Sequence, residues 1–323
     1  MILKGQNFRI LTYDEAAEKF KVVGMATNCV VNLTSNVENA SHKDIIGMAE
    51  VPTVLSQAWS VQVDSLDVTD VHAMLTAIQS LNPFTLLWDE TATANNQTPQ
   101  QAAFARSGMA YLNDATFQFD DRTNSTKSLQ FTGTGKLSTL TQAPAFEAIT
   151  PADYVKGQFV RLFLGSDNTA VPAAVIAAAK TLSLHVSLSL ERATTKDTQG
   201  TWDVQEPTSL TYDISTSALM RGADVITSAV GGKTVADLEA IQESAHPVKW
   251  QIATVGGDNQ RTKLDVIVAG SVIIQSLTLN GPNRQNADYT AQLTGYGPYI
   301  VDGYNPQMSQ LTGGSSQSAV VGS

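Results

Sequence analysis

Hydrophobic and polar residues alternate with a period of two along most of the chain, which is the pattern of β-strands that bury one face. A helical pattern interrupts it at 71–80, where Val71, Leu75 and Ile78 share one face and Asp70 is the expected N-cap. We expect a mainly β fold of sandwich or split-barrel type with a flanking helix. The strands expected in the first half are 8–12, 27–37, 58–63, 85–89, 105–120 and 128–137.

The order of these patterns occurs twice. Lys4-Gly5-Gln6 recurs as Lys156-Gly157-Gln158, an offset of 152 residues. The alternating run that begins at Cys29 recurs from Leu182, an offset of 153 residues, and each run ends in a loop with a Lys-Asp pair. Collinear repeats of this kind indicate a duplicated structural unit.

The repeat continues through the helix to the end of each half. Ala77-Ile78-Gln79 recurs as Ala240-Ile241-Gln242, and a Thr-Gly-x-Gly sequence begins at both Thr132 and Thr294. The second helix is expected after its cap, Thr234. We therefore expect two tandem copies of one domain, at 1–150 and 151–302, followed by a flexible Gly/Ser-rich tail at 303–323. The alternative is two unrelated β-rich domains.

Composition and charge narrow the function. The chain has 20 Lys and Arg against 30 Asp and Glu, a formal net charge of −10, and no basic cluster of the kind that neutralises phosphates. Charged residues make up only 15% of the chain, against about 25% in an average soluble protein. That balance suits exposed β-strands or extensive assembly contacts better than a solvated helical bundle. The start of the sequence lacks the apolar run of a signal peptide, so we expect the protein to remain in the cytoplasm in which it is made.

Sequence motifs for catalysis or cofactor binding are not convincing. The single cysteine and four histidines have no metal-ligand spacing. Gly232-Lys233-Thr234 resembles the end of a phosphate-binding loop, but position 227 is Thr227 where that motif needs glycine, so a helix cap is the better interpretation. The Thr-Gly-x-Gly glycines lie inside expected strands and indicate a bend or a close backbone approach. We expect no enzyme activity, no catalytic or metal site and no cofactor.

The repeated motifs carry a family resemblance. SHKDIIG at 41–47, GMAYLNDA at 108–115 and FTGTG at 131–135 have counterparts at 194–200, 270–277 and 293–297. In this order, between strands and a helix, they resemble the major tail tube proteins of long-tailed bacteriophages. The second copy departs from the pattern in a longer insertion and in Gly-Ser-Val where the first has Gly-x-Ala.

The resemblance implies a structural virion protein that forms a tube of stacked rings, with six domain positions per ring and a channel for the genome. Two domains per chain would then give trimeric, pseudo-hexameric rings that carry about −30 charges, three times −10, and an acidic channel through which DNA passes without specific binding. The partners it implies are further copies of the chain and other tail proteins, such as tape measure, terminator and distal tail proteins, assembled in the host cytoplasm and located in the virion tail.

The resemblance also implies that the loops at 35–52 and 192–207 reach the adjacent ring. The residues expected in these inter-ring contacts are His42, Lys43, Asp44, Lys196, Asp197 and Trp202. The alternative function is a monomeric tandem β-sandwich that binds carbohydrate or mediates adhesion, with aromatic side chains on an open face. An exposed tryptophan platform would distinguish it from an assembly subunit.

Overall fold

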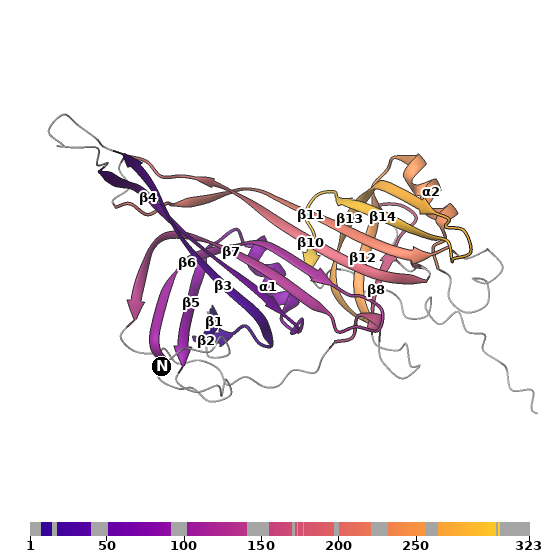
Figure 1. Cartoon of the computed structure of the whole chain (residues 1–323). Helices are drawn as coiled ribbons and strands as arrows, with labels where there is room; N and C mark the ends of the chain where they lie inside the picture. The colour runs from indigo at the N-terminus through magenta and orange to yellow at the C-terminus, as the bar shows by residue number, and fades with distance from the viewer. Residues whose placement is uncertain are drawn as a thin grey trace, which may run out of the picture.

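The computed structural model describes residues 8–14, 18–39, 51–91, 102–140, 155–169, 172, 174–176, 178–196, 200–220, 232–255, 264–301 and 303. It is mainly β, as expected: fifteen strands form one hydrogen-bonded network, and one α-helix lies in each half of the described chain (Figure 1). The expected boundary near residue 150 and nearly all of the expected tail lie outside the described residues. The domain limits therefore stay predictions.

The first half pairs its strands in the order β2-β1-β5-β6-β7-β4-β3, with every pair antiparallel. A short strand, β2, had no clear sequence pattern, and the other strands are longer than expected. The elements are β1 (Phe8–Asp14), β2 (Lys19–Val22), β3 (Ala26–Asn39), β4 (Pro52–Ser65), α1 (Val71–Gln79), β5 (Phe84–Thr91), β6 (Ala102–Gln118) and β7 (Thr126–Leu140).

The second half has the same order, β9-β8-β12-β13-β14-β11-β10, again with every pair antiparallel. A last short strand pairs with β13 where the end of β7 pairs with β6. The elements are β8 (Val160–Leu164), β9 (Ala174–Val175), β10 (Ala179–Arg192), β11 (Gln205–Leu219), α2 (Val235–Ser244), β12 (Val248–Val255), β13 (Leu264–Asn280), β14 (Asp288–Gly295) and β15 (Ile300–Val301).

Register matches as well as order. Leu33 faces Trp59 in the first half, and Val186 faces Tyr212 in the second, both 153 residues further on. The β6–β7 pair is irregular between Leu112 and Asp114, and the β13–β14 pair is irregular 162 residues later, between Ile274 and Ser276; β6–β7 has a second irregularity between Ser107 and Met109. A bulge is a specific local feature, so its occurrence at matching positions is strong evidence that positions can be compared between the halves.

The glycines of the two Thr-Gly-x-Gly sequences have the two expected structural roles, a close backbone approach and a bend. A Cβ atom on Gly133 would overlap the Trp59 ring, and one on Gly295 would lie 2.6 Å from the Tyr212 ring. The second glycine of each sequence has a left-handed backbone, with φ of +74° at Gly135 and +75° at Gly297. The close approach leaves room for an aromatic side chain that packs on a buried tryptophan in each core.

The two helices begin differently. Thr234 caps α2 as expected, in a reciprocal capping box with Asp237. Partial burial acts to raise the pKa of Asp237, but hydrogen bonds from Thr234 and the charge of Lys233 outweigh it, so this pKa is lowered. Asp70 precedes α1, but the expectation that its side chain caps the helix is wrong: its carboxylate pairs with the buried Lys127 ammonium instead.

Candidate functional site: an open-ended sheet

The two halves are joined by strand pairing between β6 and β10. Ser183 to Ser187 lie opposite Gln118 to Asp114, and Phe119 and Leu182 exchange backbone hydrogen bonds of 2.8 and 3.2 Å just beyond. We call this junction the seam. Because of it, eight strands form a continuous sheet across the molecule, in the order β3-β4-β7-β6-β10-β11-β14-β13 (Figure 1).

One face of the sheet at the seam is apolar and fully covered. Ala115 and Phe117 on β6, and Leu184 and Val186 on β10, are at most 1% exposed. The seam is reinforced from the helical side, where the Tyr299 hydroxyl donates to the Leu75 carbonyl of α1 at 2.6 Å. Each half therefore covers apolar side chains that the other half would leave in water.

The eight-stranded sheet ends in two open edges. Within the described residues, β3 pairs only with β4, and residues 273–280 of β13 have no strand on the side opposite β14. Their apolar side chains are partly uncovered: Leu33 on β3 is 53% exposed and Leu279 on β13 is 46% exposed. Unpaired edges with apolar side chains are templates for association with another strand.

Cys29 also lies on the open edge strand β3, on the same face as Leu33. Burial, together with the negative charge of Asp64, raises the pKa of the Cys29 thiol to about 11. A protonated thiol is a poor nucleophile and metal ligand, so its environment indicates a packing role.

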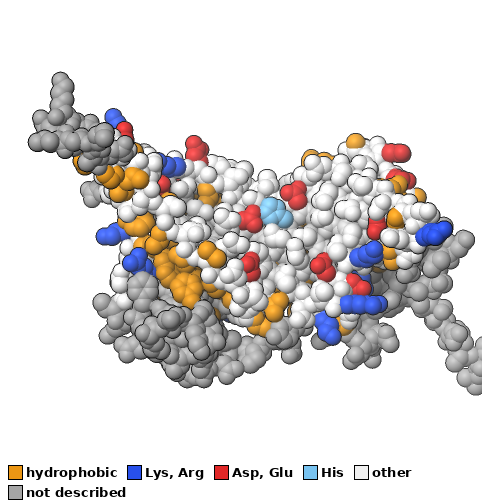
Figure 2. Space-filling model, viewed as in Figure 1, with side chains coloured by type: hydrophobic (Ala, Val, Ile, Leu, Met, Phe, Trp, Pro, Cys, Tyr) orange, Lys and Arg blue, Asp and Glu red, His pale blue; other side chains and the backbone are white. Residues whose placement is uncertain are grey.

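The other face of the sheet is polar and acidic. Along the middle of its six central strands it carries four aspartates, one histidine and otherwise only Ser, Thr and Gln; at its margins lie Tyr111, opposite Thr132, and Lys180, whose ammonium is 3.5 Å from Asp288. The positions are Ser60, Gln62, Asp64, Ser128, Gln130, Thr132, Asp114, Thr116, Gln118, Ser183, His185, Ser187, Thr211, Asp213, Ser215, Ser217, Asp288, Thr290, Gln292 and Thr294. We call it the polar face. Figure 2 shows it largely white, with acidic side chains over its middle and most basic ones toward the margins.

Side-chain hydrogen bonds link neighbouring strands across the polar face. His185 Nε2 lies 2.7 Å from Asp114 Oδ2 across the seam. The Ser128 hydroxyl donates to Asp64 at 2.7 Å, and the Gln292 amide donates to the Ser215 hydroxyl at 2.9 Å. The aspartates thus accept hydrogen bonds from the sheet while still giving this face a negative charge.

The hairpin formed by β10 and β11 reaches across to the first half. Gln57 N donates to the Thr201 carbonyl at 2.6 Å, and Asp203 N donates back to the Gln57 carbonyl at 2.9 Å. The Gly135 N–H donates to the Asp203 carbonyl at 2.8 Å. We call residues 190–196 and 200–209 the second-half arm; Figure 1 shows its strands running to the start of β4.

Of the six residues expected in inter-ring contacts, four lie outside the described residues: His42, Lys43, Asp44 and Asp197. Lys196 is exposed in a turn at the end of the second-half arm. Trp202 is partly buried and packs on the core of the first half of its own chain. The structure thus places Trp202 in a contact within the chain.

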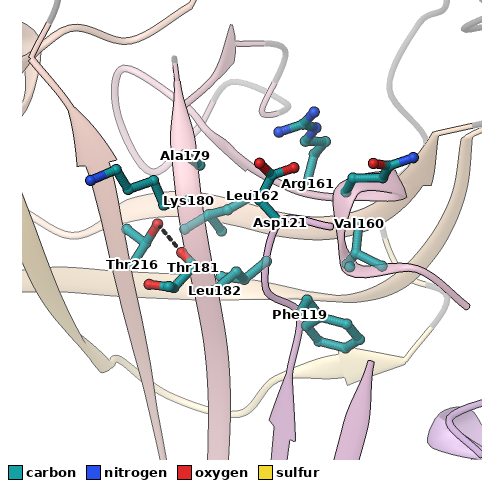
Figure 3. A pocket seen from close by; sticks show the side chains of 12 residues that line it. Phe119, Asp121, Val160, Arg161, Leu162, Ala179, Lys180, Thr181, Leu182 and Thr216 are labelled. Carbon is teal, nitrogen blue, oxygen red and sulfur yellow. Dashed lines mark hydrogen bonds between the residues drawn. The ribbon is translucent and has the colours of Figure 1, made fainter. Parts of the chain in front are cut away.

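The described residues contain little that suggests a ligand site. A small pocket beside the seam is lined by Phe119, Arg161 and Thr216, and the Thr216 hydroxyl donates to the Thr181 carbonyl at 2.9 Å (Figure 3). No group of three His, Cys, Asp or Glu in the described chain could hold a metal ion. No described helix is long and apolar enough to cross a membrane. None of the four tryptophans is exposed, so they form no open aromatic platform.

Open sheet edges are expected of such a fold, but the sequence does not identify which strands form them. The period-2 pattern identifies Leu33 and Val186 equally as inward-facing residues, and no feature of either sequence shows that only one of them is covered. The repeat was the available signal: two halves with the same strand order, joined through one sheet edge of each, leave the other two edges unused at the ends.

Comparison with known proteins gives distant matches in structure only. No family model matches the chain, and no curated protein matches it. A solved structure of the tail of an empty gene transfer agent particle has 16% identity and covers 46% of this chain and 98% of its own, with a TM-score of 0.35. The SPP1 tail tube has 12% identity and covers 49% of this chain and 87% of its own, with a TM-score of 0.36.

Proposed function

We propose that this chain is a structural subunit that polymerises into a phage tail tube, by pairing the open edge of β13 in one copy with the open edge of β3 in the next. The observation that carries the proposal is the seam. It already joins a β13-like strand, β6, to a β3-like strand, β10, and it leaves the same two kinds of edge open at the ends of the sheet. A head-to-tail contact of this kind propagates until it closes.

The seam supplies the register of the proposed contact. Leu184 lies opposite Phe117, and His185 lies opposite Thr116. Moving β10 back by 153 residues and β6 forward by 162 places Val31 opposite Leu279 and Asn32 opposite Thr278. The exposed Leu33 and Leu279 would then be covered as Val186 and Phe117 are.

The two halves, as copies of one domain, would occupy equivalent positions around a ring. If a ring has six positions, as the family resemblance implies, three chains fill it. The continuous sheet would line the inside, because its polar face is solvated while its opposite face carries the cores and helices. Four aspartates per chain, of which only Asp288 pairs with a lysine of the described chain, Lys180, would make the channel acidic and repel DNA phosphates.

Other parts of the resemblance remain proposals without support from the described geometry. These are the tape measure, terminator and distal tail partners, assembly in the host cytoplasm, and stacking of rings through His42, Lys43, Asp44, Lys196 and Asp197.

Light scattering and negative-stain microscopy of the purified chain test the proposed function. We expect particles of about 103 kDa, three times the 34.4 kDa chain, and rings or tubes in images. A 34.4 kDa monomer at every concentration, with no rings or tubes, would contradict the proposal and favour a monomeric binding module.

A further inference from the structure

We propose that the first-half arm, residues 35–39 and 51–55, docks on the second half of a neighbouring copy, on a platform formed by Leu210, Ile273, Tyr296 and Gly297. This inference rests on the proposed self-association and adds a second contact to it. It assigns the arm a lateral role, between copies in one ring, whereas the resemblance implied contact between rings.

The contact exists once already within the chain, where the second-half arm lies on the first half. Besides the bonds made by Gln57 and Gly135, the Gln205 N–H of this arm donates to the Thr134 hydroxyl at 3.0 Å. The Thr201 hydroxyl donates to the Gln57 side chain at 2.9 Å. The arm also lies close to Tyr111, which is 7% exposed; burial, together with the charge of Glu206 on the arm, raises the pKa of Tyr111.

A matching site exists on the second half, and no arm among the described residues lies on it. With the offsets of 153 and 162 residues, Gln57, Tyr111, Thr134 and Gly135 correspond to Leu210, Ile273, Tyr296 and Gly297. Gly297 has the same backbone conformation as Gly135, with φ of +75° against +74°. The Gly297 N–H therefore points in the direction that corresponds to that of the Gly135 N–H, which donates to the Asp203 carbonyl.

Side-chain exposure distinguishes the site on the first half, which the second-half arm covers, from the matching platform on the second half. Tyr296 is 53% exposed and Ile273 is 36% exposed, whereas Tyr111 is covered. The first-half arm is apolar and uncovered too: Val37, Val54 and Leu55 are all exposed. The chain thus exposes two apolar surfaces, an arm and a platform, and each corresponds to one side of a contact that the chain already makes internally. A second copy of this chain is therefore the partner that fits the platform.

The partner's position agrees with the proposed strand pairing. The second-half arm continues from β10, the strand that forms the seam, and crosses to β4 and β7 of the half to which β10 is paired. The first-half arm continues in the same way from β3. Pairing of β3 with β13 of a neighbour therefore brings this arm over the platform of that same neighbour.

Hydrogen–deuterium exchange tests the docking. In the monomer, at low concentration, we expect residues 200–205 of the docked second-half arm to be protected and residues 51–55 to exchange fast. On assembly, 51–55 should become protected to a similar degree. Assembly without protection of 51–55 would overturn the arm inference and leave the proposed function standing, whereas absence of assembly would count against both.

Substitution of the platform gives an independent measurement. Tyr296→Asp should weaken self-association by roughly tenfold in sedimentation experiments, because it places a charge where an apolar contact forms. Leu81→Asp is the matched control, because Leu81 is an exposed apolar residue outside the platform and the arm; it should change association little. Equal association of Tyr296→Asp and Leu81→Asp, with both variants folded by circular dichroism, would overturn the proposal.

Discussion

Leu33 and Val186 occupy matching positions in β3 and β10, each opposite an aromatic residue of the next strand, yet Leu33 is 53% exposed and Val186 is 1% exposed. The difference comes from the neighbour and not from the residue: β6 lies beside β10, and no described strand lies beside the outer edge of β3. Burying the exposed half of the Leu33 side chain would contribute about 1 kcal/mol. The open edge thus favours association.

Charge on either open edge should prevent assembly without unfolding the chain. Leu33→Asp and Leu279→Asp each replace a half-exposed side chain, so the monomer should lose less than about 1 kcal/mol of stability. In the assembly the same carboxylate would be buried without a partner, at a cost of several kcal/mol. Sedimentation should show monomers for both variants, while thermal melting stays near that of wild type. If both variants form rings as well as the wild type does, the proposed edge contact is contradicted.

Substitutions in the Thr-Gly-x-Gly sequences should separate the two structural requirements for glycine, which are close packing against an aromatic ring and a positive φ. Gly133→Ala should destabilise the fold by roughly 1–3 kcal/mol, because its Cβ would overlap the buried Trp59 ring. Gly135→Ala has open space but keeps a φ of +74°, so about 1 kcal/mol is expected. Urea unfolding of both variants measures the difference. Gly281→Ala, with open space and no positive φ, is the control and should be close to neutral.

The α2 capping box should make stability depend on pH in the acid range. The folded-state pKa of Asp237 is lowered, so its contribution is present above the unfolded pKa of about 4 and is lost as pH falls through the folded value. Asp237→Asn should therefore cost roughly 0.5–2 kcal/mol at pH 7 and progressively less below pH 4. Chemical unfolding at pH 7 and pH 3 checks this, and an equal cost at both values would contradict it.

The acidic polar face should be what keeps DNA from binding. Gln130→Lys with Gln292→Lys adds two positive charges at matching positions of the face, and short duplex DNA should then bind at low salt and dissociate as salt rises. Glu243→Lys changes the net charge by the same amount at an exposed position on α2 and should not bind. Fluorescence anisotropy of labelled DNA compares them. Equal binding by the two variants would show that position on the face is irrelevant.

Much of the fold could be predicted from sequence because its determinants are local. Period-2 alternation located six strands of the first half, and the Thr234 cap located the start of α2. The failures are non-local. Asp70 is an ordinary cap in sequence, but it pairs with Lys127, 57 residues away. The strand β2 is too short to show an alternating pattern.

The candidate site was less predictable for the same reason. The polar face follows from the abundance of Ser, Thr and Gln in alternating positions, but which strands share that face depends on the seam. The expectation for Trp202 followed from its loop, whereas its partners, around Gln57, are brought to it by β10 crossing the first half. Both features depend on contacts between the halves, and no residue pattern encodes those.

Disulfide trapping detects the proposed β3–β13 contact itself. The variant carries Asn32→Cys and Thr278→Cys, with Cys29→Ser to remove the native thiol. Within one chain the two new cysteines are separated by seven strand spacings, roughly 30 Å. Between paired chains they lie directly opposite each other. They match His185 and Thr116 of the seam, which belong to a non-hydrogen-bonded pair, with a Cα separation of about 4.5 Å that suits a disulfide.

A non-reducing gel after mild oxidation is the readout. If the chains pair through these two edges in a closed ring of three, we expect a ladder that ends at three chains, about 103 kDa from a 34.4 kDa chain. His185→Cys with Thr116→Cys should give an oxidised monomer, and Asn28→Cys with Thr278→Cys, four residues out of register, should not cross-link. Monomers alone from Asn32→Cys with Thr278→Cys, under conditions that fully oxidise the control with His185→Cys and Thr116→Cys, would contradict pairing of β3 with β13 between chains.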